Sequence, residues 1–375
     1  MKKASLFISI IIFIISCFIA YDVINRKEEI HFIPTIKEID DGVKSIKFKV
    51  DTFYLAIGES EKLNYDIESS KDDYKLTWSS ENEDIVSISD GKIVGINLGT
   101  SVVTLKSESG KKAEVSVMVT DLIRKPELDD KKKFLPCHAY TEEEAHIIDE
   151  TLRTRVLNKG EGTRAALIET IRFMTLSFKY KVSYFYENGR MHESGVRKAD
   201  GEGRYYHKGL YLSEDKFKDI KVSHKGPAIW GCPLTNLQDH NRYKPGAKMP
   251  NGLDCSGFVT WSLYNSGLDV GDIGAGINDR HKDMSDVGEM HSLTYEYANS
   301  GDYKVGDVIA RWGHTALIAG KDSEYLYIAE SLLKGVRIEK VSYKNPNSSL
   351  YKYYAYINKM DKEYSKNDDY TDMWE

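Results

Sequence analysis

One cysteine stands where the sequence predicts the start of a helix, and this position limits how the chain can fold. Asp254 suits the N-cap position, and Cys255 falls in the first turn. Phe258 and Trp261 repeat behind them at helical spacing. The unpaired N–H groups and the dipole of a helix start favour the thiolate form of a cysteine. The small Ser256 leaves the sulfur uncrowded, so we expect Asp254 and Ser256 to support the helix cap and a bound oxyanion.

A histidine follows about sixty residues later, at the mouth of a predicted strand. His314 precedes the apolar run 315–319, which is typical of a buried strand, and a shorter strand run lies at 308–310. A base on a strand can lie within hydrogen-bond distance of a nucleophile at a helix N-terminus. We therefore predict that His314 is the general base for Cys255.

A third polar group should orient the imidazole of this histidine. After a turn at 321–324, the run 325–331 predicts a strand that pairs with the His314 strand as a hairpin. Glu330 lies near the end of that strand and is the predicted orienting residue, although a solvent-facing carboxylate is the alternative. Asn345 and Asn347, in a predicted loop, are the other candidates.

These two segments resemble a known family. Asp-Cys-Ser-Gly-Phe-Val, followed by Gly-Asp and then Gly-His-Thr-Ala-Leu-Ile-Ala-Gly, resembles the NlpC-type papain-like cell-wall cysteine peptidases over roughly residues 160–360. The resemblance implies that Cys255 is the nucleophile and His314 the base. The third residue of that family is usually His, Asn or Gln, so Glu330 departs from the pattern. Glu330 instead matches the related CHAP amidase-peptidases, which often use a glutamate.

The resemblance implies hydrolysis of amide bonds in peptidoglycan stem peptides, beside a γ-D-glutamyl residue, through a thioester and without a cofactor. Stem peptides and the cell wall are the expected partners. A CHAP-like amidase, a transpeptidase and a non-catalytic wall-binding surface protein are the alternatives. The formal net charge of −6 argues against a nucleic-acid partner. No cysteine and histidine spacing fits a zinc site, so we expect no metal.

Aromatic residues gather in the region 180–215 and suit a groove that binds a polar polymer. Tyr184 and Tyr186 are candidates there, and packing against helices is the alternative. Trp230 takes the place of an aromatic residue that many NlpC-type enzymes carry before the cysteine. Trp312, just before the histidine, completes the set of candidate groove residues.

The N-terminus predicts a membrane location. Two lysines precede an uncharged run at 4–21, which is long enough to cross most of a bilayer. Residues 1–24 therefore predict a signal anchor that holds the body of the chain outside the cell membrane, facing the wall. Lipidation at Cys17 is one alternative, because the preceding residues resemble a lipobox, and ordinary signal cleavage is another. A bridge between Cys137 and Cys232 would leave Cys255 as the free thiol after this segment.

The rest of the chain divides into a predicted stalk at 25–44, a β domain at 45–120 and a charged linker at 121–140. Short alternating runs between glycines predict an all-β sandwich for the β domain. Trp78 within it is either a core residue or a platform for a sugar. The segments Leu-Ala-Ile-Gly-Glu, Thr-Trp-Ser-Ser, Asp-Gly-Lys-Ile-Val and Leu-Gly-Thr-Ser-Val-Val resemble a bacterial immunoglobulin-like group 2 domain.

Two predicted helices open the last domain, which we expect to span 141–365 with an α+β papain-like fold. Thr141 and Glu144 form a predicted capping box for the first helix, and the second starts near Thr163. The acidic end, 366–375, predicts a solvated tail. The fold expected overall is thus multidomain, with an anchor, an immunoglobulin-like sandwich and a papain-like catalytic domain.

Overall fold

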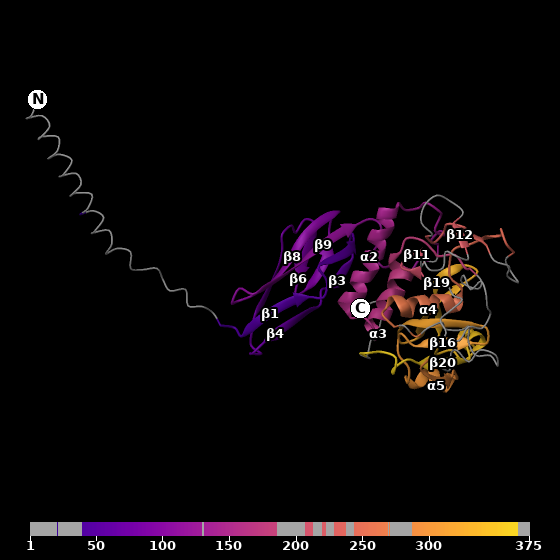
Figure 1. Cartoon of the computed structure of the whole chain (residues 1–375). Coiled ribbons are helices and arrows are strands. Elements are labelled where there is room, and N and C mark those ends of the chain that lie inside the picture. The colour runs from indigo at the N-terminus through magenta and orange to yellow at the C-terminus, as the bar shows by residue number, and fades with distance from the viewer. Residues whose placement is uncertain are drawn as a thin grey trace, which may run out of the picture.

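The computed structural model describes residues 21, 40–129, 131–185, 207–212, 220–222, 229–237, 244–268, 270 and 287–366. These residues form mostly β-strands with few helices (Figure 1). We refer to residues 43–120 as the β module and to residues 121–366 as the mixed module. Cys17, Tyr186 and the tail from residue 367 onwards lie outside the described residues.

The predicted membrane location is corrected. A helix that crosses a bilayer needs about 20 mainly apolar residues. Among the residues that the structure describes, no helix combines this length with sufficient apolar character. Among the described helices, α2 (Glu142–Lys159) has 18 residues and carries charged side chains along its length. The run at 4–20 lies outside the described residues. The prediction of an anchored chain whose body faces outwards is therefore not made again.

The β module consists of short strands in three sheets around one core. β8 (Gly99–Ser107) and β9 (Lys112–Thr120) alternate buried with more exposed residues, which is the pattern of a half-buried strand. This agrees with the predicted all-β module at 45–120. The other strands are β1 (Val43–Phe48), β2 (Thr52–Ala56), β3 (Ser60–Lys62), β4 (Tyr65–Ser69), β5 (Leu76–Ser80), β6 (Val86–Ser89) and β7 (Lys92–Gly95).

Trp78 packs among aromatic rings of this module. Its ring centroid lies 5.7 Å from those of Phe48 and Tyr65. Gly91 has a positive φ of 78°, and a Cβ there would lie 2.9 Å from the Trp78 ring. These contacts favour Trp78 as a core residue rather than as a platform for a sugar.

A buried group of ion pairs joins the β module to α2, which lies alongside its strands (Figure 1). Arg155 of α2 donates to Glu59 at 2.7 Å and lies 3.6 Å from Glu169, and all three side chains are at most 2% exposed. Glu61 of β3 pairs in turn with Lys159 and Arg172. Burial raises the pKa of Glu169, because its charged form loses contact with water. The two modules therefore share a charged interface that is largely buried.

The segment predicted as a charged linker is packed against the mixed module. Ile123 is buried, and Arg124 Nε donates to the Leu176 carbonyl at 2.9 Å. Lys132 Nζ donates to the carbonyls of Thr175 and Phe178 at 2.8 and 3.0 Å. A flexible spacer would leave these groups in water, so the prediction of a linker at 121–140 is wrong in this respect.

The helices of the mixed module start as predicted. Thr141 Oγ1 accepts a hydrogen bond from the Glu144 N–H, and the Glu144 carboxylate accepts one from the Thr141 N–H, which confirms the capping box. Thr163 caps the second helix. The helices are α2, α3 (Arg164–Arg172), the π-helical turn η1 (Phe173–Ser177), α4 (Cys255–Asn265), α5 (Tyr295–Ser300) and α6 (Ser349–Tyr353).

One antiparallel six-stranded sheet forms the centre of the mixed module. Its order is β15-β20-β16-β17-β18-β19, and α4 packs against β17 and β18. The strands are β15 (Glu289–Ser292), β16 (Val308–Arg311), β17 (His314–Lys321), β18 (Tyr325–Leu332), β19 (Gly335–Ser342) and β20 (Tyr356–Lys359). Smaller sheets contain β10 (His207–Lys208), β11 (Tyr211–Leu212), β12 (Ile220–Val222), β13 (Leu234–Asn236) and β14 (Lys248–Met249).

Candidate functional site

Cys255 is the first residue of α4, as the sequence predicts. The Asp254 carboxylate accepts hydrogen bonds from the Gly257 N–H at 2.6 Å and from the Ser256 hydroxyl at 3.3 Å. Asp254 thus satisfies an N–H of the first turn, and Cys255 is only 5% exposed. The thiol therefore lies in the field of the helix start and is largely removed from bulk water.

The segment just before this helix is hydrogen-bonded to the central sheet. The hydroxyl of Ser331 in β18 donates to the Leu253 carbonyl at 2.7 Å, two residues before Cys255. The Leu253 N–H donates to the Ser183 carbonyl at 3.0 Å. A Cβ at Gly252 would collide with the same Ser183 carbonyl, so only glycine fits there. Together with the packing of α4, these contacts bring the cysteine helix onto the strands that carry His314 and Glu330.

The predicted base and orienting residue contact each other directly. His314, the first residue of β17, is 5% exposed, and its Nε2 lies 2.8 Å from Glu330 Oε2. The Tyr354 hydroxyl donates to the same carboxylate oxygen at 2.9 Å. Arg337 donates to Oε1 from Nε and from a terminal nitrogen at 3.0 and 2.7 Å. Glu330 thus holds the imidazole while two other side chains hold Glu330.

Glu330 remains ionised in this setting. Burial by itself would raise its pKa, but the hydrogen bonds from His314, Arg337 and Tyr354 outweigh burial and lower the pKa to about 2. Burial and the neighbouring Glu330 charge raise the pKa of Tyr354 well above its usual range, so the phenol stays a donor. Glu330 therefore carries a negative charge beside the imidazole of His314 at neutral pH.

This shift predicts acid sensitivity. The folded chain holds the Glu330 pKa near 2, below its ordinary value of 4.5, so the carboxylate contributes stability that is complete above pH 4.5 and lost as the pH falls towards 2. Glu330→Gln should lose less stability than the wild type over that interval. Urea unfolding at several pH values measures the difference. Parallel losses in both proteins would show that Glu330 is not the group responsible.

Arg337 and Tyr354 were not predicted from the sequence. Arg337 could have been found, because the short turn between β18 and β19 pairs it directly with Glu330. Tyr354 is one of 25 tyrosines and lies before β20, far from Glu330 in sequence, so no local pattern indicates it. The loop alternatives Asn345 and Asn347 bond to each other instead, within their turn.

The predicted groove residues that the structure describes, Tyr184, Trp230 and Trp312, differ widely in exposure. Trp230 is fully buried, and its ring centroid lies 5.3 Å from that of Trp261, so it belongs to the core and its assignment to a groove is wrong. Tyr184 is partly buried. Trp312 is 70% exposed in the turn between β16 and β17, next to His314. Among the groove candidates that the structure describes, Trp312 is therefore the one openly placed for contact with a large substrate.

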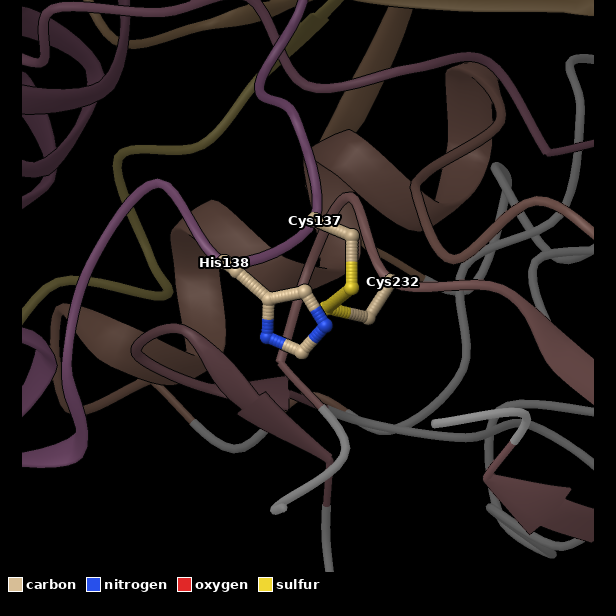
Figure 2. A group of neighbouring side chains, drawn as sticks. All are labelled: Cys137, His138 and Cys232. Atoms are coloured by element: carbon tan, nitrogen blue, oxygen red, sulfur yellow. A yellow bond between two sulfur atoms is a disulfide. The ribbon is translucent and has the colours of Figure 1, made fainter. Parts of the chain in front are cut away.

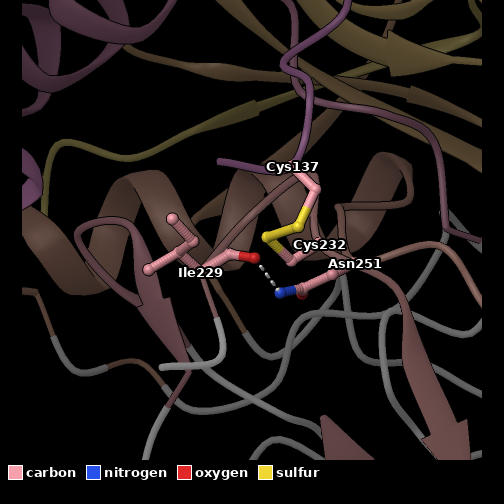
Figure 3. Close-up of a disulfide and its surroundings, with 4 residues drawn as sticks. All are labelled: Cys137, Ile229, Cys232 and Asn251. Atoms are coloured by element: carbon pink, nitrogen blue, oxygen red, sulfur yellow. Dashed lines mark hydrogen bonds between the residues drawn. A yellow bond between two sulfur atoms is a disulfide. The ribbon is translucent and has the colours of Figure 1, made fainter. Parts of the chain in front are cut away.

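A disulfide joins Cys137 and Cys232, as the sequence suggested (Figure 3). Among the described cysteines, Cys255 is the one outside a disulfide. Asn251 Nδ2 donates to the Ile229 carbonyl at 2.7 Å beside this bridge. The bridge and this bond secure the chain that leads to α4.

His138 lies beside the bridge, and its ring nitrogen and the two sulfurs come within 4.8 Å of one another (Figure 2). Such a trio resembles a set of metal ligands. Both sulfurs are bonded to each other, however, so neither is a thiolate that could bind a metal. The group is a disulfide with a neighbouring imidazole.

No family model and no curated protein matches the chain. Solved structures similar to it include domains 4 and 5 of the S-layer protein SbsC, at 18% identity and a TM-score of 0.19 over 21% of this chain and 52% of that one. SbsC domains 4–9 match at 17% identity and a TM-score of 0.20, over 27% and 18% of the two chains. An EHEC O157:H7 intimin mutant matches at 16% identity and a TM-score of 0.17, over 30% of this chain and 64% of that one. The chain spans less than two thirds of each, and such low scores support no inference about fold or function.

Proposed function

We propose that the chain is a papain-like cysteine hydrolase that cleaves amide bonds in peptidoglycan stem peptides. The proposal is carried by the buried contact of 2.8 Å between His314 and Glu330, on strands against which the Cys255 helix packs. Nucleophilic catalysis by a thiol needs a base that a third group orients and a helix start that favours the thiolate. The substrate class follows from the resemblance of the two segments to NlpC-type peptidases.

The reaction proceeds in two halves. His314 takes the proton of the Cys255 thiol, and the thiolate forms a bond to the carbonyl carbon of the scissile amide. The backbone N–H of Cys255 stabilises the oxyanion. Protonated His314 gives its proton to the leaving nitrogen, so that an amine departs and a thioester remains. Water, deprotonated by His314, then attacks the thioester, which releases a carboxylic acid and restores the thiol.

Glu330 acts through His314 and does not touch the substrate in this scheme. Its negative charge stabilises the imidazolium that forms when Cys255 is deprotonated. Arg337 and Tyr354 use three hydrogen bonds to keep the carboxylate in one orientation. The β module, which we propose to be a bacterial immunoglobulin-like group 2 domain, supplies none of these groups.

The glutamate also favours a second candidate function. A glutamate that contacts the histidine is the arrangement expected for CHAP-like enzymes, which include amidases. An amidase would cut between the glycan and the first alanine of the stem peptide, whereas the endopeptidase would cut beside γ-D-glutamate. The two activities leave different new amino groups on the products.

Digestion of purified sacculi by the full chain tests the proposal. Mass spectrometry of the released muropeptides should show a new amino terminus next to γ-D-glutamate, and none in a parallel digest with Cys255→Ala. A new terminus at the first alanine would replace the endopeptidase with the amidase. Equal release by the wild type and Cys255→Ala would remove the hydrolase altogether.

A further inference from the structure

A cavity of about 200 Å³ opens beside the candidate base. The residues that line it include His314, Glu330, Arg337, Glu339, Arg311 and Tyr353. Because the proposed nucleophile acts on a substrate next to His314, this cavity is a space in which the described residues can hold a neighbouring part of that substrate.

Arg311 lies beside His314 on the adjacent strand. The two residues are direct partners in the antiparallel pair of β16 and β17. Residues paired in this way project to the same face, with their Cβ atoms about 5 Å apart. Arg311 and His314 therefore project from the same face of the sheet as neighbours.

The charges in the cavity leave Arg311 available. Arg337 donates to Glu330 and, at 2.7 Å, to Glu339, so its charge is matched by two carboxylates. In the part of the chain that the structure describes, no carboxylate lies within ion-pair distance of Arg311. Its guanidinium lies 5.8 Å from the centre of the Tyr353 ring, and both side chains are exposed.

This arrangement suits a small oxyanion such as a carboxylate. A guanidinium binds a carboxylate through two parallel hydrogen bonds, and the Tyr353 ring restricts the positions that Arg311 can take. The two arginines of the cavity balance its two glutamates, and the carboxylates lie against Arg337.

We propose that Arg311 binds a free carboxylate of the substrate, on the residue next to the scissile amide. The inference rests on the proposed function, because it takes His314 as the base. A γ-linked glutamyl residue carries such a carboxylate, since its side-chain carbonyl forms the amide and its α-carboxyl stays free. The cavity would then select an acidic glutamyl unit over its α-amide.

Two synthetic peptides test this selection. One is L-alanyl-γ-D-glutamyl-L-lysine, and the other is the same tripeptide with the α-carboxyl of its glutamyl residue converted to an amide. Binding is measured by calorimetry with the full chain carrying Cys255→Ala, so that the readout does not depend on turnover. Loss of a charge-assisted hydrogen bond corresponds to about 10- to 100-fold in affinity. Adding Arg311→Met should weaken binding of the acid by that factor and leave binding of the amide nearly unchanged, and Arg311→Lys should restore part of the difference.

Lys334→Met is the matched control, because it removes an exposed positive charge from the turn between β18 and β19, outside the cavity lining. Equal affinity of the acid and the amide for the Cys255→Ala chain, or an equal loss with both when Arg311→Met is added, would overturn the proposal. Selective binding of the acid without any hydrolysis by the wild type would keep the carboxylate site and refute the hydrolase. Hydrolysis of both peptides by the wild type at the same rate would keep the hydrolase and refute the carboxylate site.

Discussion

Cys255→Ala is expected to lower kcat for peptidoglycan peptides by at least about 10⁴-fold, since losses of this size follow removal of a catalytic nucleophile. The alanine has no atom that can form the thioester, and His314 then has no thiol to deprotonate. Binding should persist, because the residues of the cavity beside His314 are unchanged. The measurement is the rate of release of new amino groups from soluble muropeptides, together with labelling by a thiol-reactive probe at neutral pH.

Two controls separate lost chemistry from lost structure. The change to alanine removes one buried sulfur at the first residue of α4, so the free energy of unfolding should fall by only about 1 kcal/mol. Cys255→Ser keeps a nucleophile of similar size but a much less acidic one, and it should also be nearly inactive. A Cys255→Ala protein that retains more than a tenth of the wild-type rate would show that the sulfur is not the nucleophile.

Arg155→Met is expected to destabilise the folded chain by about 3–5 kcal/mol, because it leaves buried carboxylates without their cation. Arg155 is 0% exposed and bridges Glu59 of the β module and Glu169 of α3. Its guanidinium also donates to the Tyr54 carbonyl at 3.3 Å. Methionine fills part of the volume but replaces none of these bonds. Urea unfolding, followed by tryptophan fluorescence, measures the loss.

Arg153→Met provides the matched control on the same helix. Arg153 pairs with Glu150, but its side chain is 54% exposed, so loss of that pair should cost at most about 1 kcal/mol. If both variants lose the same small amount of stability, the junction between the modules does not depend on its buried charges. A second unfolding step in Arg155→Met alone would indicate that the modules have separated.

The sequence predicted elements best where local chemistry decides the structure. Asp254 and Thr141 are caps because their side chains satisfy nearby N–H groups, and those bonds involve residues only three positions apart. The hairpin that pairs the His314 strand with the Glu330 strand followed from two apolar runs and the turn between them. These features need no knowledge of distant residues.

Predictions failed where distant residues decide the environment. Trp230 was assigned to a groove from its place before the cysteine, but its contact with Trp261 of α4 buries it. The charged run near Lys132 predicted a linker, whereas the carbonyls of η1 hold its amine more than forty positions away. The hydrogen bond from Tyr354 to Glu330 likewise depends on how the chain returns to the sheet before β20.

The disulfide has a consequence for damage by proteases. Cys137 and Cys232 are 95 positions apart, and the bond closes a covalent ring that contains α2 and α3. A protease that cuts once inside this ring opens it without releasing either fragment. The nicked molecule would migrate as one band on a non-reducing gel and as two bands after reduction, so one cut would not detach the cysteine helix from the β module.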